Sequence, residues 1–114
     1  IYSTPRDLLK FDRARNAPDF LNPTLLEQVY LGYSNEHKGI KNYGLGIRMI
    51  NWDTGQNFYF HNGWWHGNTS SYISLRNEKL TIIALSNKFT TKTYQVRKIS
   101  SLFGDYPFRL DKEE

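Results

Sequence analysis

Two segments near the start of the chain repeat apolar residues at the spacing of an α-helix. Thr4 and Pro5 form an N-cap followed by a proline at the first helical position, and they predict a helix of about three turns that ends near Asn16. Asn22 and Pro23 repeat this signal before a second, shorter helix. Both predicted helices are amphipathic and need a partner surface, because their apolar residues recur on one side: Leu8, Leu9 and Phe11 in the first, and Leu25, Leu26, Val29 and Tyr30 in the second.

After a polar loop, apolar and polar residues alternate with a period of two, which is typical of β-strands. Turn signals separate these segments at residues 53–55 and 77–79, and their short length favours antiparallel hairpins. A polar and aromatic loop is expected at residues 61–68, between the second and the third strand. The strands predicted in this way cover residues 43–50, 57–61, 70–76 and 80–86.

The segment 80–86 differs from the others because it is apolar on both faces. That composition predicts a central strand of the sheet, covered on both sides. After it, Thr90 or Thr91 caps a predicted final helix, with Gly104 and Pro107 as stop signals. The expected apolar stripe of this helix consists of Tyr94, Val96, Ile99, Leu102 and Phe103.

The order of helix, helix, four strands and helix predicts the α+β class, with an antiparallel β-sheet flanked by helices. A chain of 114 residues accommodates one small domain. A central strand needs neighbours on both edges and cover on both faces, and the predicted elements supply these only in part. The chain also opens without a methionine, directly on a helix-start signal. We therefore expect residues 1–114 to be a single domain that forms the C-terminal part of a larger one.

The charges are scattered along the chain and do not form a basic run. The formal net charge is +4 and the isoelectric point is near 9.4, but acidic residues lie among the Lys and Arg residues. We therefore expect no nucleic-acid partner. No segment approaches the roughly 18 apolar residues of a membrane span, so none is expected here. The absence of cysteine excludes disulfides and thiolate metal sites.

The segment 61–68 is the part of the chain that most resembles a binding site. It combines two glycines with two large aromatic residues, Trp64 and Trp65, at the end of a predicted strand. Gly63 and Gly67 have no Cβ atom, so a ligand can approach the backbone beside flat apolar rings. The same residues also fit a tight turn capped by aromatic side chains. The local pattern leaves both interpretations open.

Four pieces of the chain follow one another in a familiar order and spacing. They are residues 1–11, residues 43–47 (Tyr-Gly-Leu-Gly-Ile), His61-Asn62-Gly63 with Gly67 and Ser70-Ser71 after it, and residues 80–87. Together they resemble the C-terminal part of the serine β-lactamase and penicillin-binding-protein superfamily, in the branch of class C β-lactamases, D-alanyl-D-alanine carboxypeptidases and related esterases. The resemblance implies the β-lactamase/transpeptidase-like fold, a small-molecule or peptide substrate, no cofactor, and a bacterial protein of the periplasm or another extracytoplasmic location.

The resemblance also implies roles for individual residues. The family combines a Ser-x-x-Lys nucleophile helix, a Tyr-x-Asn or Ser-x-Asn element and a Lys-Thr-Gly or His-x-Gly strand. His61 and Gly63 match the third part: the imidazole would place a donor beside the nucleophile, and the glycine would let the substrate lie along the strand. The backbone N–H of Trp64 would be an oxyanion-hole donor. The expected substrate-binding residues are Asn62, Trp65 and Tyr43.

Two departures from the family pattern affect the expected activity. Asn62 stands where the family often has a Thr or Ser that helps to hold a substrate carboxylate, so an esterase or peptidase-like relative is as well supported as a β-lactamase. No serine of the chain has a lysine three places later. Tyr33-Ser34-Asn35 spells Tyr-x-Asn, but it follows the first helix, whereas the family places this element before that helix. We interpret it as a chance match.

The missing nucleophile leads to an expectation about partners. The Ser-x-x-Lys motif is expected in a missing N-terminal part of the same chain, so this segment should not be active alone. If the fold of the family holds, the strand at 80–86 loses part of its cover when it is separated from that part. An uncovered sheet edge pairs readily with another chain, and self-association is therefore expected.

Two alternatives to the hydrolase remain. Aromatic residues make up 16% of the chain, and flat rings stack on sugars, so a non-catalytic module that binds glycan or peptidoglycan is possible. Its platform would consist of Trp64, Trp65, Tyr43, Tyr59 and Tyr72. A metal site has weaker support, because His61 and His66 lie five places apart, His37 is remote and no standard ligand spacing is present; we expect no metal.

Overall fold

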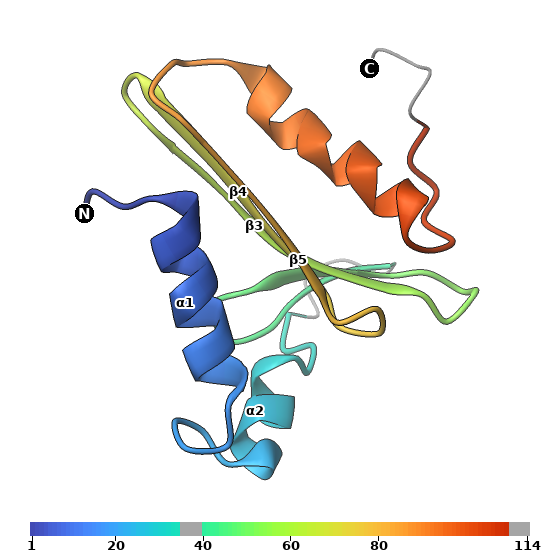
Figure 1. Cartoon of the computed structure of the whole chain (residues 1–114). Coiled ribbons are helices and arrows are strands. Elements are labelled where there is room, and N and C mark those ends of the chain that lie inside the picture. The colour runs from blue at the N-terminus through green and yellow to red at the C-terminus, as the bar shows by residue number, and fades with distance from the viewer. Residues whose placement is uncertain (35–39, 110–114) are drawn as a thin grey trace.

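The computed structural model describes residues 1–34 and 40–109 of the chain. These residues form a five-stranded antiparallel sheet whose strands lie in sequence order. The expected α+β class, an antiparallel sheet flanked by helices, is confirmed (Figure 1). The strands are β1 (Lys41–Tyr43), β2 (Arg48–Asn51), β3 (Asn57–Trp65), β4 (Asn68–Leu75) and β5 (Leu80–Ser86).

The two N-terminal helices begin where the sequence predicts. The first, α1, spans Pro5–Asn16, and the second, α2, spans Pro23–Val29. The Thr4 hydroxyl accepts a hydrogen bond from the backbone N–H of Asp7 at 3.1 Å, and the side chain of Asn22 caps α2 in the same way. These caps satisfy donors that the first turn of a helix leaves without an intrahelical partner.

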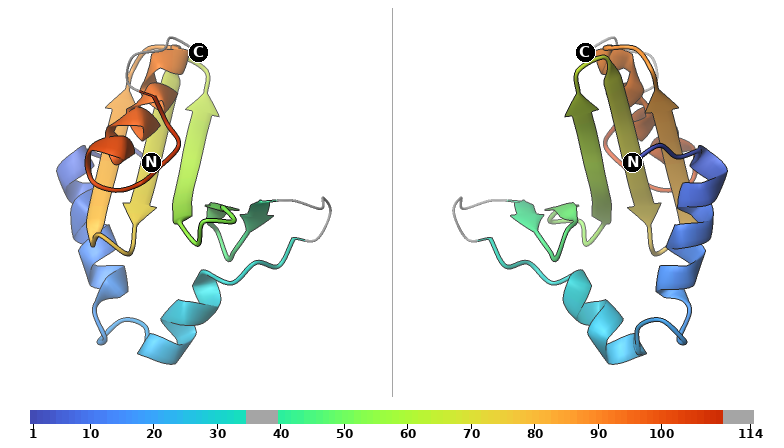
Figure 2. Two further views of the ribbon diagram at one scale, coloured as in Figure 1. Left: turned by 90° about the vertical axis from the view of Figure 1, so that its right-hand side faces the viewer. Right: turned by 90° about the vertical axis from the view of Figure 1, so that its left-hand side faces the viewer.

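Helices lie on both faces of the sheet. The helix α1 lies against one face of the sheet at β5 and reaches β4 through hydrogen bonds, with α2 following it, and the C-terminal helix η1 (Thr91–Leu102) lies on the other face (Figures 1 and 2). The sheet is therefore the middle of three layers.

No helix in residues 1–34 and 40–109 combines the length and hydropathy needed to cross a bilayer.

The final helix has the predicted position and a different geometry. It is a 3₁₀-helix, which has three residues per turn, so the stripe expected from an α-helical period does not stay on one side. Ile99, Leu102 and Phe103 of that stripe are exposed. Thr93 and Ser100, which the pattern did not place inside, are buried. The expected stripe is therefore wrong for its C-terminal half.

The predicted strand at 43–50 is wrong in its middle, because the chain turns there and divides into β1 and β2. Gly46 has a φ of +73°, a left-handed value that favours glycine. A Cβ atom on Gly44 would lie 2.2 Å from the carbonyl oxygen of Val29, so this residue packs directly against the end of α2. Ile47 lies in this turn, yet it is only 1% exposed. An apolar residue was therefore present in the turn, and it extended the alternating pattern that predicted a single strand.

The predicted loop at 61–68 is also wrong. The strand β3 continues to its partner β4 through a connection of only His66 and Gly67. His66 has a φ of +51°, a left-handed value found in two-residue hairpin turns. Gly63 pairs with Ser70 inside the hairpin. Local propensity predicted a loop here, but continuous pairing with the neighbouring strand β4 outweighs that propensity.

The expected central position of the strand at 80–86 is wrong as well. In the part of the chain that the structure describes, β5 stands at the end of the strand order and pairs only with β4. The helices α1 and η1 contact it from opposite faces (Figure 2). This two-sided cover explains why the strand is apolar on both faces without being central.

The main apolar cluster lies between the sheet and the C-terminal segment. Phe58, Ile73 and Leu75 lie on the two longest strands and are at most 2% exposed, and Tyr106 covers them. The ring centroid of Phe58 is 6.2 Å from that of Tyr106 and 5.0 Å from that of Phe108. The cluster therefore anchors the first half of β3, and the second half extends from it.

Replacing Phe58 with alanine should lower the free energy of unfolding by about 3–5 kcal/mol, because the change removes a buried ring and leaves a cavity. Phe20 is 63% exposed and provides a matched control, for which Phe20→Ala should cost less than about 0.5 kcal/mol. Urea denaturation followed by circular dichroism measures both values. Equal losses in the two variants would contradict the assigned core.

Candidate functional site

The second half of β3 has a free edge. The strand β2 pairs with β3 only as far as Phe60, whereas β4 accompanies it to Trp65. Among the described residues, no other strand pairs with β3 from His61 onward. His61 is exposed, and Asn62 and Gly63 are half-buried. The His-x-Gly segment therefore lies at an accessible strand edge and not in a packed interior.

Two hydrogen bonds hold the imidazole of His61. Its Nδ1 lies 3.0 Å from the carbonyl oxygen of Asn62, and its Nε2 lies 3.0 Å from the hydroxyl of Tyr43. Because a carbonyl oxygen only accepts, Nδ1 carries the proton in the neutral ring, and Nε2 accepts from the tyrosine. The guanidinium of Arg48 lies 5.9 Å from the Tyr43 ring centroid. The structure thus brings together two of the expected site residues, His61 from β3 and Tyr43 from β1.

Asn62 points to the opposite face of the sheet from His61, as alternation along a strand requires. Its Oδ1 accepts a hydrogen bond from the Ser71 hydroxyl at 2.8 Å, and the residue lines a cavity of about 300 Å³ on the η1 side. Tyr94 of η1 lines the same cavity and donates to the carbonyl oxygen of Gly63 at 3.1 Å. The amide expected to meet a substrate is therefore engaged within the protein, on the face away from the imidazole.

The backbone of β3 is bare at Gly63 and is followed by two exposed indoles. A Cβ atom on Gly63 would lie 2.4 Å from the hydroxyl oxygen of Ser70, so a side chain there would press on the neighbouring strand. Trp64 and Trp65 are 65% and 74% exposed. The ring of Trp64 packs against Phe89, with centroids 5.7 Å apart. Large apolar surfaces therefore stand beside the uncovered backbone.

The five aromatic residues expected to form a glycan platform do not form one surface. Tyr59 packs edge-on against Tyr30, with ring centroids 4.9 Å apart, and Tyr72 donates a hydrogen bond to a carboxylate of α1. Both side chains therefore lie in the contact between the sheet and the helices. The two indoles of the β3–β4 hairpin and Tyr43, which is 37% exposed, are the exposed part of the expected platform.

Most of the chain matches a known protein family. The model of a family described as Beta-lactamase matches residues 1–102. The chain belongs to the β-lactamase family. Its antiparallel sheet with helices on both faces agrees with the serine hydrolase-like fold of that family. No curated protein sequence matches the chain.

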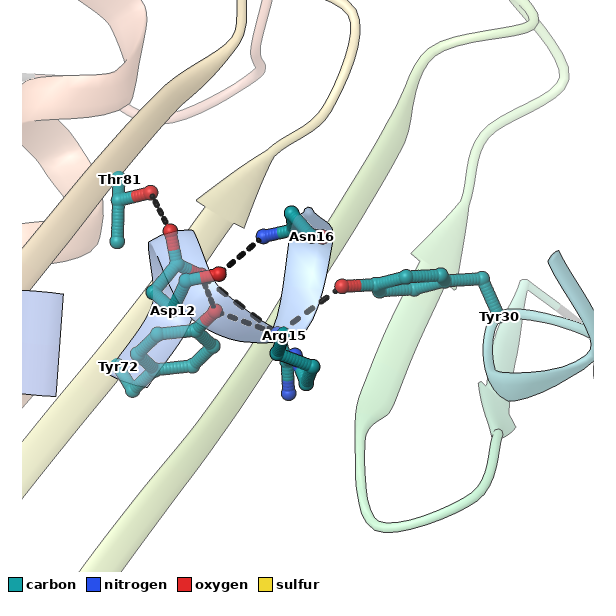
Figure 3. Close-up of polar contacts among 6 residues, drawn as sticks. All are labelled: Asp12, Arg15, Asn16, Tyr30, Tyr72 and Thr81. Atoms are coloured by element: carbon teal, nitrogen blue, oxygen red, sulfur yellow. Dashed lines mark hydrogen bonds and ion pairs between the residues drawn. The ribbon is translucent and has the colours of Figure 1, made fainter. Parts of the chain in front are cut away.

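In this β-lactamase-family chain, a buried carboxylate fastens α1 to the sheet (Figure 3). Asp12 is 5% exposed and accepts hydrogen bonds from the hydroxyls of Tyr72 and Thr81, the latter at 3.0 Å. Arg15 lies 3.6 Å from the same carboxylate and donates to the Tyr72 hydroxyl at 2.6 Å. Such partners offset the large cost of taking a charge out of water. Because Tyr72 pairs with His61 across the hairpin, the network also fixes the strand beside the imidazole.

This network was not predicted from the sequence, although a signal for it is present there. Leu8, Asp12 and Arg15 follow the helical spacing i, i+4 and i+7, so two charged residues share a face of α1 with an apolar one. Phe11, which was expected on the apolar side, is 57% exposed. Opposite charges on the inner face of an amphipathic helix indicate a buried polar contact.

Some sequence-based expectations fall on residues that the structure does not describe. His37 and Asn35, the last residue of the Tyr-x-Asn match, both lie in the segment 35–39 and outside the described residues. Within the described ranges, no three His, Cys, Asp or Glu residues gather closely enough to hold a metal ion. His61 is hydrogen-bonded through both ring nitrogens, and His66 lies at the hairpin turn against the Trp65 ring.

Burial, together with the hydrogen bond to Asp12, raises the pKa of Tyr72 well above its ordinary value. The fold therefore favours the neutral phenol, whose contribution to stability is complete below about pH 10 and is lost as the pH rises toward the folded-state pKa. Tyr72→Phe should lower the free energy of unfolding at pH 7 by about 1–3 kcal/mol, because Asp12 loses a donor. It should also flatten the fall in stability above about pH 10.

Urea unfolding at several pH values measures both effects of the Tyr72 substitution. Tyr2→Phe provides the control, because Tyr2 is exposed at the start of the chain and loses one hydroxyl in the same way. A pH dependence that is the same in Tyr72→Phe and in the unmodified protein would contradict the assignment.

Proposed function

We propose that this chain supplies the His-x-Gly strand of a serine acyl hydrolase, which is a β-lactamase, a D-alanyl-D-alanine peptidase or an esterase-like relative. The observation that carries the proposal is the free edge of β3 at His61 and Gly63, next to the hydrogen-bonded Tyr43. A substrate can lie along such an edge, because extended ligands pair with strands that lack a neighbour. Membership in the β-lactamase family supports the reaction class.

The proposal places the attacking group outside these 114 residues. No serine here is followed by lysine at the third position, whereas the nucleophile of the family lies in Ser-x-x-Lys. The missing N-terminal part of the same polypeptide is therefore the first partner of this chain, which is inactive alone. A small-molecule or peptide substrate is the second partner. Related enzymes act in the bacterial periplasm or otherwise outside the cytoplasm, and the proposal extends that location to this protein.

Each residue at the free edge has a proposed role. The Nε2 atom of His61 accepts a hydrogen bond from the Tyr43 hydroxyl, so this pair can hold a proton beside the nucleophile. Gly63 leaves room for the substrate to approach the strand. The backbone N–H of Trp64 stabilises the negative oxygen of the acyl-transfer intermediate, and one such donor typically contributes a factor of about 10² to 10³ in kcat. Trp65 supplies an apolar surface for the substrate.

Asn62 makes an ester or peptide substrate at least as well supported as a β-lactam. Related enzymes often use a hydroxyl at this position to hold a substrate carboxylate. The side-chain oxygen of Asn62 instead accepts a hydrogen bond from Ser71, on the face of the sheet away from His61. The carboxylate contact is thus missing from the face where the proposed chemistry occurs, which supports substrates that do not depend on it.

Non-catalytic binding of glycan or peptidoglycan is a second candidate. The observation that favours it is the exposure of Trp64 and Trp65, because flat rings stack on the apolar faces of sugars. The packed positions of Tyr59 and Tyr72 leave this candidate with a smaller platform than the sequence suggested.

A serine-reactive probe tests the hydrolase proposal. In the polypeptide that contains both parts, a fluorophosphonate should label the serine of an upstream Ser-x-x-Lys. His61→Ala should slow labelling about 10²-fold, because the proton-handling group is lost. The same variant should change the free energy of unfolding by less than about 0.5 kcal/mol, since His61 is exposed.

His66→Asn is the matched control in the labelling experiment, because His66 is exposed on the same hairpin, lies outside the proposed pocket and has a left-handed φ that asparagine tolerates. It should label at the rate of the unmodified protein, and the 114-residue chain alone should not be labelled. Equal rates in the two histidine variants would refute the role of His61. A complete polypeptide without Ser-x-x-Lys would refute the hydrolase and favour the glycan-binding candidate.

We also propose that the isolated chain self-associates through β5. This strand contains no proline and no charged residue, which commonly protect an edge strand, and in the described residues its outer side has no strand partner. Light scattering on the isolated chain should therefore detect dimers or larger species. Leu85→Lys, at a position 37% exposed, should shift the chain to monomer, whereas Leu31→Lys, at a position 54% exposed outside the sheet, should not. Detection of monomer alone at every concentration would refute pairing.

A further inference from the structure

A second cavity lies on the α1 side of the sheet, near the β4–β5 turn. Its volume is about 480 Å³, which lies within the range of small-molecule sites. The last turn of α1 and the strands β4 and β5 line it together with one residue of α2. It shares no lining residue with the free edge of β3 at His61.

The wall of this cavity includes a hydroxyl that has no hydrogen-bond partner among the described residues. Ser74 and Thr81 are paired across β4 and β5, and both line the cavity. The Thr81 hydroxyl donates to Asp12, as described above. Ser74 is 6% exposed, and its hydroxyl forms no hydrogen bond with the residues that the structure describes. The hydroxyl oxygen is not among the fully buried polar atoms that lack a partner, so it opens onto the cavity that Ser74 lines, where a ligand can accept its hydrogen bond.

The charges around the cavity are predominantly positive. The carboxylate of Asp12 is compensated by Arg15 and by two hydroxyls, and Arg76 is paired with a glutamate of α2 at 2.5 Å. Arg13 and Lys79 also line the cavity, and neither forms an ion pair within residues 1–34 and 40–109. Two positive charges at the rim therefore lack a negative partner, and they attract an anion to the cavity.

We propose that this cavity binds a small organic anion through a phosphate or carboxylate group. The anionic oxygens accept a hydrogen bond from Ser74 and lie between Arg13 and Lys79, and the remainder of the ligand lies against Leu26 and Leu80. Hydrogen bonds between a hydroxyl and an ionised oxygen are stronger than those between neutral groups, so the serine contributes to affinity as well as position. The site is independent of the proposed hydrolase, because it uses none of its residues.

Calorimetric titration tests the proposal with three probes: inorganic phosphate, phenyl phosphate and succinate, at an ionic strength kept constant with chloride. At least one probe should bind saturably to the protein. Ser74→Ala should weaken that binding about 10-fold, and Arg13→Gln and Lys79→Asn should each weaken it several-fold. Asparagine suits position 79, because Lys79 has a φ of +54° and asparagine tolerates left-handed backbone. Binding of the phosphates alone assigns a phosphate group, and binding of succinate assigns a carboxylate.

Lys92→Gln is the matched control for the rim variants. Lys92 is exposed on η1, on the other face of the sheet, and its substitution removes the same unit of charge, so affinity should not change. Absence of saturable binding for all three probes would overturn the proposal, and so would equal affinities in the control and the rim variants. Arg13 and Lys79 are exposed, so their variants carry the test even where Ser74→Ala alters folding.

Discussion

Backbone hydrogen bonding between β3 and β4 is the constraint on which the candidate site depends. The pairing runs without a break from Tyr59 opposite Ser74 to Trp65 opposite Asn68. It keeps β3 extended beyond Phe60, where β2 no longer pairs with it. The exposed side chains of this half therefore belong to an ordered strand. The aromatic cluster around Phe58 anchors the base of this hairpin, and the far end needs no core of its own.

The two faces of the sheet are held by different kinds of interaction. On the η1 side, aromatic and aliphatic side chains pack around Phe58. On the α1 side, the buried carboxylate of Asp12 collects hydroxyl and guanidinium donors from two strands and from its own helix. Apolar contacts tolerate small sliding of a helix, whereas a buried charge must meet particular donors. The polar contacts therefore define the position of α1 under the strand that pairs with His61.

Sequence alone predicted the features that depend on neighbouring residues. The cap at Thr4 and the hairpin turns at residues 53–55 and 77–79 are local, and they were predicted correctly. Errors at 43–50 and 61–68 arose because contacts distant in sequence decided them: one segment bends where a glycine meets α2, and the other stays extended because β4 pairs with it. The resemblance to a family pointed to His61, but its hydrogen bond to Tyr43 depends on how β1 folds back, which no local pattern records.

Successive side chains of β3 point to opposite faces of the sheet, so odd-numbered and even-numbered residues lie on different faces. His61 and Asn62 are adjacent in the chain, yet one meets Tyr43 on the side of α1 and the other meets Ser71 on the side of η1. Adding or deleting a single residue inside β3 would exchange these two environments for every residue that follows. The length of this strand is therefore as strictly constrained as the identity of its residues, and insertions can be accommodated only at the turns.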